Sequence, residues 1–347
     1  MMDMGNQHLF VDLSQRGLDV FTGDGSQDRI VNKADVKGLN ISRNLLTFLP
    51  YNLAQFSGLV ELDISNNQVA IISEEIVQLQ CLKTFTAKNN LIDQSSLPKN
   101  FGECPVLEVL NLSGNSFVDF PIQLTELQNL KFLYIGGNFI TDIPREIGNF
   151  RRLELLYLGG NRLKTLPVEI GALSNLQTLA LSDNKLQDLP AELTKLTSLQ
   201  SLSLHNNLLT TLPTQIITLS NLCELSLRGN PLVVRFIRDF AWQPPTLLEL
   251  AARCVKNQHL SYSLTDLPAN LYHYLNHAKK CVNPNCKGVY FNSRVENIKF
   301  VDFCGKYRLP LMQYLCSPQC RTSTHSSSSS ESESEDEDSR LKRVLLG

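Results

Sequence analysis

The chain has no long hydrophobic run, which argues against a membrane-spanning helix. Its apolar stretches are only a few residues long, such as Val344-Leu345-Leu346, whereas a transmembrane helix needs about 20 apolar residues. The first fifteen residues, MMDMGNQHLFVDLSQ, have neither a basic nor an apolar segment, so we expect no signal peptide and no membrane partner. We therefore expect the nine cysteines to be reduced thiols or metal ligands in the cytoplasm, or also in the nucleus.

An excess of charge of one sign is also missing. The sequence has 32 Lys and Arg against 34 Asp and Glu, and six of the acids fall within residues 331–338. The remaining charges are spread along the chain, so no basic footprint for nucleic acid is present. The sequence also lacks a phosphate-binding P-loop, a dinucleotide fingerprint after a strand, H-E-x-x-H and G-x-S-x-G. These absences favour a non-catalytic binding protein over an enzyme.

Leucine is abundant instead, at 60 of 347 residues. The leucines follow the pattern L-x-x-L-x-L-x-x-N, which recurs every 23 residues apart from one interval of 25. Leu-Pro follows most copies and begins the second half of the repeat. A period of this length predicts a solenoid, because one repeat cannot bury its own leucine face and must stack on its neighbours. The asparagines of the pattern are Asn44, Asn67, Asn90, Asn115, Asn138, Asn161, Asn184, Asn207 and Asn230.

The spacing within one repeat has a physical cause. Leu133 and Ile135 alternate with their neighbours, which indicates a short strand with both side chains pointing inward. Asn138 comes where the chain turns, and its amide can bond backbone groups that are otherwise unpaired there. This pattern resembles the leucine-rich repeats of Ras-suppressor and scaffold proteins over roughly residues 31–235. The resemblance implies an α/β leucine-rich repeat solenoid of nine repeats, with a turn or short helix on the convex side.

Composition divides the chain into five segments. A degenerate strand at Val11-Asp12-Leu13-Ser14 indicates a cap before the repeats, and the pattern ends near Arg235. The array is followed by two amphipathic helices, a cysteine-rich segment and a serine-rich acidic segment. The composition of the serine-rich acidic segment predicts disorder. The predicted segments are a cap at 1–30, the repeat array at 31–243, the helices at 244–279, a four-cysteine module at 280–321 and a disordered tail at 322–347.

The concave sheet of the solenoid is the expected site for a protein substrate. Its outward residues are small or polar in early repeats, such as Asp63 and Thr86, but large and apolar in repeats five and six. Exposed aromatic side chains ringed by polar groups are typical of protein-binding hot spots, and the neighbouring glycines would leave room for a partner's backbone. The alternative is that scattered exposed aromatics have no role. The expected substrate-binding residues are Phe132, Tyr134, Leu155, Tyr157, His205 and Arg228.

The first helix after the array begins near Thr246. Thr246 followed three residues later by Glu249 is a capping-box pattern. The apolar residues Leu247, Leu250, Ala251 and Cys254 recur at helical spacing and form one stripe. A second helix begins at Pro268, with Leu271, Tyr274 and Leu275 on one face. One interpretation is that both helices cap the last repeat, because amphipathic helices usually face their own core.

A second interpretation rests on a resemblance. The pattern over 246–255 resembles the elongin-C-binding box of SOCS-box substrate receptors, and the pattern over 267–275 resembles the cullin box that follows it. Ala251 departs from the usual Cys, and Thr265-Asp266 replaces an upstream Leu-Pro. The resemblance implies binding of elongin B/C and of cullin-5, or cullin-2, with its RING partner. It places elongin binding on Thr246, Leu247, Leu250, Ala251 and Val255, and cullin binding on Leu267, Pro268, Leu271, Tyr274 and Leu275.

Four cysteines form two closely spaced pairs. Cys281 and Cys286 are five residues apart, and Cys316 and Cys320 are four apart. Two such pairs can complete a closed tetrahedral site, so we expect one structural zinc per chain in a small ribbon. The segments 289–291, 298–303 and 311–315 look like its strands. The alternative is a set of buried thiols without metal. Cys304 is left over, as a further ligand or a core thiol.

The tail offers a regulatory pattern. Ser328, Ser330, Ser332 and Ser334 each have an acid three residues later, which suits an acidophilic kinase. A purely solubilising tail is the alternative.

Two functions follow from these patterns. The first is a substrate receptor of an elongin B/C–cullin-RING ubiquitin ligase, in which the repeats choose the protein. The second is a non-enzymatic intracellular scaffold of the Ras-suppressor type, in which the helices only cap. An enzyme hidden in the cysteine-rich module is a third and weaker interpretation.

Overall fold

The computed structural model describes residues 9–21, 32–49, 51–232, 244–283, 285–303, 307–320 and 343–345. The chain divides into two compact units. The first holds the repeats up to Pro231, apart from Thr210–Thr214, together with the C-terminal residues from Leu341. The second holds Thr210–Thr214 and Leu232–Arg340.

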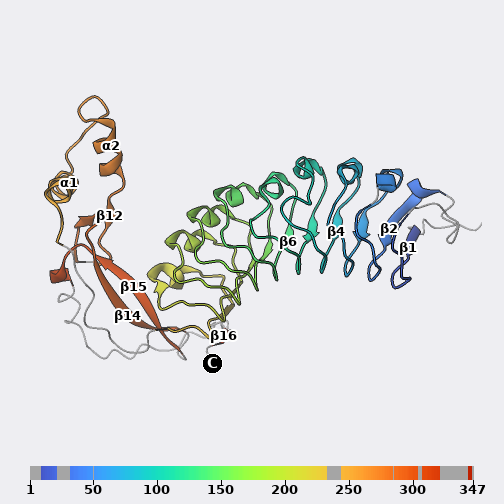
Figure 1. The fold of residues 1–347 in the computed structure, drawn as a ribbon. Helices are drawn as coiled ribbons and strands as arrows, with labels where there is room; N and C mark the ends of the chain where they lie inside the picture. The colour runs from blue at the N-terminus through green and yellow to red at the C-terminus, as the bar shows by residue number, and fades with distance from the viewer. Residues whose placement is uncertain are drawn as a thin grey trace, which may run out of the picture. The chain divides into compact units, whose positions relative to one another are not determined.

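The first unit is built on one parallel sheet of 11 strands (Figure 1). Neighbouring repeats pair in register, so that Leu110, Leu133 and Leu156 are cross-strand partners and all three are buried. This confirms the predicted solenoid, with nine repeat strands and a strand of the N-terminal cap. Its strands are β1 (Leu9–Asp12), β2 (Val36–Asn40), β3 (Glu61–Asp63), β4 (Thr84–Thr86), β5 (Val109–Asn111), β6 (Phe132–Tyr134), β7 (Leu155–Tyr157), β8 (Thr178–Ala180), β9 (Ser201–Ser203), β11 (Glu224–Ser226) and β16 (Arg343–Leu345).

Short 3-10 helices return the chain from one strand to the next. They use the second half of each repeat, where Pro fixes the backbone at the entry to the turn, as at Pro144 and Pro167. The turn is thus a 3-10 helix. Among the described residues, α-helices are found only outside the repeats. The 3-10 helices are Lys33–Asp35, Tyr51–Gln55, Glu74–Gln78, Phe101–Glu103, Ile122–Glu126, Arg145–Asn149, Val168–Ala172, Ala191–Lys195 and Thr214–Thr218.

The asparagine ladder joins each repeat to the next. The buried Asn138 amide donates to the carbonyls of Leu112, Ile135 and Gly136 at 3.0–3.2 Å. Its oxygen accepts from the backbone N–H groups of Asn115 and Phe117. The ladder therefore satisfies backbone groups of two repeats at once, as the sequence predicts.

The second unit combines two helices with small sheets (Figure 1). Its helices are α1 (Leu247–Asn257) and α2 (Ala269–Asn276). The strands β14 (Val295–Phe303) and β15 (Tyr307–Leu315) form an antiparallel pair, to which β10 (Leu212–Pro213) adds in parallel. A second pair joins β12 (Lys279–Lys280) to β13 (Val289–Tyr290).

The structure divides the C-terminal half differently from the sequence. The helices and the four-cysteine segment were expected as separate modules, with a boundary at 279/280. Instead Ala252 of α1, Leu275 of α2 and Phe291 share one small core. The helices and the cysteine segment each have little apolar surface alone, so they are stabilised together.

Within the part of the chain that the structure describes, no helix combines the length and the apolar character needed to span a membrane.

Candidate functional site

Repeats five and six place a cluster of large side chains on the outward face of the sheet, which we call the strand face. Phe132 pairs with Leu155 and Tyr134 pairs with Tyr157 across β6 and β7. The two tyrosine rings have centroids 6.4 Å apart. Tyr157 is 39% exposed, and the other three are half-buried. The structure therefore brings together four of the six residues that the sequence predicts for substrate binding.

The glycines beside this cluster have a different role from the one expected. A Cβ at Gly136 would lie 2.2 Å from Cε1 of Tyr157, and one at Gly159 would lie 3.2 Å from its hydroxyl oxygen. The space is therefore filled by the Tyr157 ring of the same chain, and the prediction that it stays open for a partner's backbone is wrong. Gly137 and Gly160 serve the turns, because both have a positive φ, of 65° and 69°.

His205 and Arg228 lie further along the strand face, in repeats eight and nine. The Nδ1 atom of His205 is 2.9 Å from the Ser203 hydroxyl, and its Nε2 atom is 3.6 Å from a carboxylate oxygen of Asp183. Arg228 is exposed. These groups add a polar region to the face, and its use in binding stays a prediction.

Helix α1 is held to its unit by a charged face rather than by its apolar stripe. The Thr246 hydroxyl caps the helix by accepting from the backbone N–H of Glu249. The Glu249 carboxylate accepts from the backbone N–H groups of Phe291, Asn292 and Ser293 and pairs with Arg253. Glu249 thus ties α1 to the segment after β13, a role that the capping-box pattern did not reveal.

Arg253 extends this connection toward the cysteines. Its guanidinium donates to the carbonyl of Cys316 at 2.7 Å and to the carbonyl of Ser293. Burial raises the pKa of Glu249, but hydrogen bonds from the Ser293 and Phe291 N–H groups and from Arg253 outweigh it, so the pKa lies below its ordinary value. The side chain of Glu249, only 2% exposed, is therefore stabilised as an anion.

The apolar stripe of α1 faces solvent. Leu247 is 86% exposed, and Leu248 and Leu250 are about half exposed. Ala251 and Cys254 are also exposed. Of the five residues expected to bind elongin, Val255 alone packs against the small core of the unit. Such a row of exposed apolar side chains on a short helix is typical of a surface that binds another protein.

Most of the expected cullin-box residues contribute to the core of the unit. Leu267, Tyr274 and Leu275 belong to the cluster around Phe291. The Tyr274 ring stacks on the Phe291 ring with centroids 4.6 Å apart. Pro268 is exposed and Leu271 half-buried, so these two are the best placed to touch a partner directly.

The four paired cysteines converge as the sequence predicts. The sulfur atoms of Cys281, Cys286, Cys316 and Cys320 all lie within 4.8 Å of one another. The Cys286–Cys316 and Cys316–Cys320 separations are 3.5 and 3.6 Å. Four thiolates at about 2.3 Å from a tetrahedral zinc ion would be separated by distances close to these. Cys304 lies outside the described residues.

The backbone around the sulfurs suits a metal site. The N–H groups of Gly288 and Cys316 point to the sulfurs of Cys286 and Cys281 at 3.3 and 3.4 Å. A Cβ at Gly288 would lie 2.8 Å from the Cys316 sulfur, so glycine allows this close approach. Burial raises the pKa of the Cys281 and Cys316 thiols. The cluster could hold one divalent ion with thiolate ligands.

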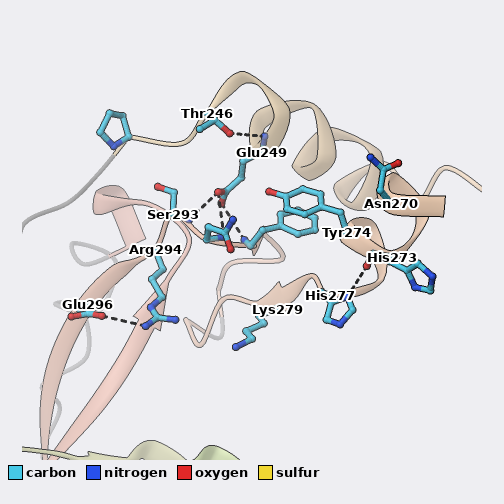
Figure 2. A pocket seen from close by; sticks show the side chains of 13 residues that line it. Thr246, Glu249, Asn270, His273, Tyr274, His277, Lys279, Ser293, Arg294 and Glu296 are labelled. Atoms are coloured by element: carbon cyan, nitrogen blue, oxygen red, sulfur yellow. Dashed lines mark hydrogen bonds and ion pairs between the residues drawn. The ribbon is translucent and has the colours of Figure 1, made fainter. Parts of the chain in front are cut away.

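A hollow of about 900 Å³ opens beside α2 in the same unit (Figure 2). Asn270, His273 and His277 line it from α2 and its C-terminal end, and Lys279 follows on β12. The imidazole Nδ1 of His277 donates to the carbonyl of His273 at 2.6 Å. The remaining walls are Pro244, Thr246, Glu249, Tyr274, Phe291, Asn292, Ser293, Arg294 and Glu296. Of these lining residues, the sequence assigned only Thr246 and Tyr274 to binding, as members of the two boxes.

The comparison with known families agrees with this architecture. Residues 145–239 match the family described as leucine-rich repeat region, and residues 105–163 match leucine rich repeat. With its ladder and parallel sheet, the molecule is a leucine-rich repeat protein, a class built for protein interaction.

Curated relatives narrow the class. Leucine-rich repeat-containing protein 58 of Xenopus laevis is 65% identical over 319 residues, which cover 91% of this chain and 91% of the relative. The protein of the same name from Homo sapiens is 68% identical over 286 residues, covering 81% of this chain and 77% of the relative. The chain belongs to the leucine-rich repeat-containing protein 58 family.

Solved structures support the solenoid. A TDR receptor matches with a TM-score of 0.56 and 30% identity over 65% of this chain and 39% of that chain. The Arabidopsis receptor kinase HAESA, solved with the peptide hormone IDA and the co-receptor SERK1, matches with a TM-score of 0.55 and 27% identity over the same shares. The likeness covers well under half of each receptor chain.

Proposed function

We propose that this protein is the substrate-recognition subunit of an elongin B/C–cullin-RING ubiquitin ligase. The observation that carries the proposal is the exposure of Leu247, Leu248 and Leu250 on α1. The opposite face of the helix, with Glu249 and Ala252, already holds it in place. The apolar stripe is therefore available for a groove on another protein, which is how an amphipathic helix is commonly bound.

Elongin B/C is the proposed partner of this stripe. Leu247→Asp should abolish co-purification of elongin C, because a carboxylate would replace the most exposed leucine of the contact. The matched control is Leu91→Asp, since Leu91 is also an exposed leucine, at 56%, and lies in the repeat array. Undiminished elongin binding by Leu247→Asp, or equal loss in both variants, would contradict the assignment.

The cullin is proposed to bind beside α2. Pro268→Ala combined with Leu271→Ala should lose cullin-5, or cullin-2, but keep elongin, because neither residue belongs to the small core of the unit. Tyr274→Ala is unsuitable for this test, since it removes the stack on Phe291. Retention of both partners by the double variant would show that α2 has a purely structural role.

The substrate is proposed to bind the aromatic cluster on the strand face. Tyr134→Ala with Tyr157→Ala removes both rings and should abolish substrate capture and ubiquitylation, while elongin still binds. A control pair on the same face, Thr84→Ala with Thr86→Ala, changes polar residues of an earlier repeat and should leave capture intact. Normal turnover of the substrate by the tyrosine variant would place the site elsewhere.

The four cysteines are proposed to hold one structural zinc ion. The set would leave no open position for a substrate, so the ion would stabilise the second unit and take no part in a reaction. The convergence of the four sulfurs within 4.8 Å supports this role.

A further inference from the structure

The hollow beside α2 is more basic than a simple count of its acidic and basic side chains suggests. Arg294 is 3.5 Å from Glu296, and Glu249 is neutralised by Arg253 and three backbone N–H groups. The two acids of the wall are therefore already paired. Lys279, an exposed residue with no anionic partner among the described residues, remains as the cationic group able to attract an anion, and the imidazole of His273 can donate a hydrogen bond to it.

The distribution of charged residues along the chain also makes the second unit the more basic one. Residues 244–320 contain nine Lys and Arg against four Asp and Glu, whereas residues 1–243 contain 19 against 24. Residues 331–338, with the sequence ESESEDED, contain six acids and no basic residue. An acidic segment of this chain is therefore attracted to the second unit and repelled by the repeats.

The acidic segment also starts within reach of the hollow. Cys320 shares a small cluster with Val295, which lies between the pocket residues Arg294 and Glu296. Ten residues separate Cys320 from Glu331, and an extended chain of that length spans on the order of 35 Å. Measured from Cys320, this length is enough for Glu331 to reach the hollow. The other end of the run is tethered as well, because β16 begins at Arg343, five residues after Asp338, and pairs with β11.

We propose that the acidic run 331–338 docks in cis in the hollow lined by His273, His277, Lys279 and Arg294. The glutamates and aspartates pair with the Lys279 ammonium and accept from the imidazole N–H of His273, and Asn270 and Asn292 offer neutral donors. Phosphorylation of Ser332 and Ser334 strengthens the docking, because each phosphate adds charge and acceptor oxygens. As a consequence that rests on the proposed function, the docked tail lies beside Thr246 and Tyr274 of the two partner boxes.

Zero-length carbodiimide cross-linking of the full chain reads out the docking independently of any ligase partner. An amide cross-link should form mainly between the Lys279 amine and a carboxylate of 331–338, identified by peptide mass spectrometry. Lys279→Arg should remove this cross-link while keeping the charge. Equal cross-linking of Lys256, Lys279 and Lys287 would overturn the proposal, since it would show that the acidic run contacts these lysines without preference for the hollow.

Binding in trans gives a second readout. A labelled peptide of residues 326–339 is titrated into the full chain whose six tail acids are replaced by Gln and Asn. Lys279→Glu should weaken binding about tenfold, whereas the control Lys287→Glu, an equal change of charge on an exposed lysine outside the hollow, should change it less than about twofold. The peptide phosphorylated on Ser332 and Ser334 should bind more tightly. Equal loss in both lysine variants, or no gain from phosphorylation, would contradict docking in the hollow.

Discussion

Glu249 shows most clearly how one residue positions the candidate site. Its carboxylate accepts three backbone N–H groups of the segment 291–293 and pairs with Arg253. The sequence marks Glu249 as part of a capping box, and the cap by Thr246 is present. The carboxylate, however, turns away from the helix start, because the 291–293 backbone supplies buried donors that need an acceptor.

Glu249→Gln should destabilise the second unit by about 3 kcal/mol at pH 7, because it leaves Arg253 without its buried anion. The pKa of Glu249 is lowered on folding, so its stabilisation is present above the ordinary carboxylate pKa and is lost as pH falls through the folded value. The difference between the two chains should therefore shrink below about pH 4. Hydrogen exchange of the backbone amides of residues 247–257 measures this difference in stability.

The matched control is Glu108→Gln in the repeats. Glu108 pairs with Lys83 and Lys131 near the surface, so its loss should cost less than about 1 kcal/mol. Any metal that the four cysteines hold would be released by acid from the parent and from Glu249→Gln alike, so its loss would cancel in the difference between the two chains. A Glu249→Gln chain as stable as the parent at pH 7 would show that the connection contributes nothing.

The strand face shows where residue-level prediction from sequence stops. The sequence placed Phe132, Tyr134, Leu155 and Tyr157 on one face because strand alternation fixes direction. It could not show that the Tyr157 ring lies over Gly136 and Gly159, since the ring's rotamer depends on neighbours such as Gly136, which lies 21 residues earlier in the preceding repeat.

Among the elements, helix α1 exposes its apolar face and buries its charged face, the reverse of what an amphipathic helix usually does. Hydrophobic periodicity predicts that Leu247, Leu250 and Cys254 turn inward. In the structure Glu249, Ala252 and Arg253 face the unit and the leucines face solvent. The charged face wins because it meets backbone donors and carbonyls that apolar groups would leave unsatisfied.

The asparagine ladder is the element that the sequence predicted best. Asn138→Ala should destabilise the array by at least about 3 kcal/mol, because it leaves several buried backbone groups unpaired in two repeats. Asn175→Ala is the control, since this exposed side chain donates a single bond, to the Arg151 carbonyl, and should cost less than about 1.5 kcal/mol. Urea unfolding followed by circular dichroism compares them, and equal midpoints would argue against the ladder as a stabilising element.

The cysteine cluster can be tested by metal analysis. The purified chain should hold about one zinc per molecule, and a chelator should make the second unit sensitive to protease. Cys286→Ser should lose the metal, whereas Cys81→Ser, an exposed cysteine of the repeats, should keep it. Full occupancy in Cys304→Ser would show that Cys304 is no ligand. A parent chain that is free of metal yet resists protease would refute the zinc site.

At the scale of the whole molecule, sequence predicted the regular part and missed the irregular one. The repeats, their register and the cap follow from a period that every repeat restates, as the pairing of β1 with β2 shows. The second unit has no period. Its core of Ala252, Leu275 and Phe291 joins segments far apart in sequence, and no local pattern reports such contacts. The convergence of the four cysteines was predictable because two closely spaced pairs are the pattern that a tetrahedral metal site would need.

We propose that the molecule joins a substrate-binding array to an elongin-binding helix. Titration of purified elongin B/C into the purified chain, followed by calorimetry, tests both the binding and its place on α1. A one-to-one complex that forms with the parent chain and with Leu91→Asp, and that is lost with Leu247→Asp, is the predicted result. Absence of binding heat with the parent chain at every concentration, or full binding by Leu247→Asp, would show that α1 does not bind elongin B/C.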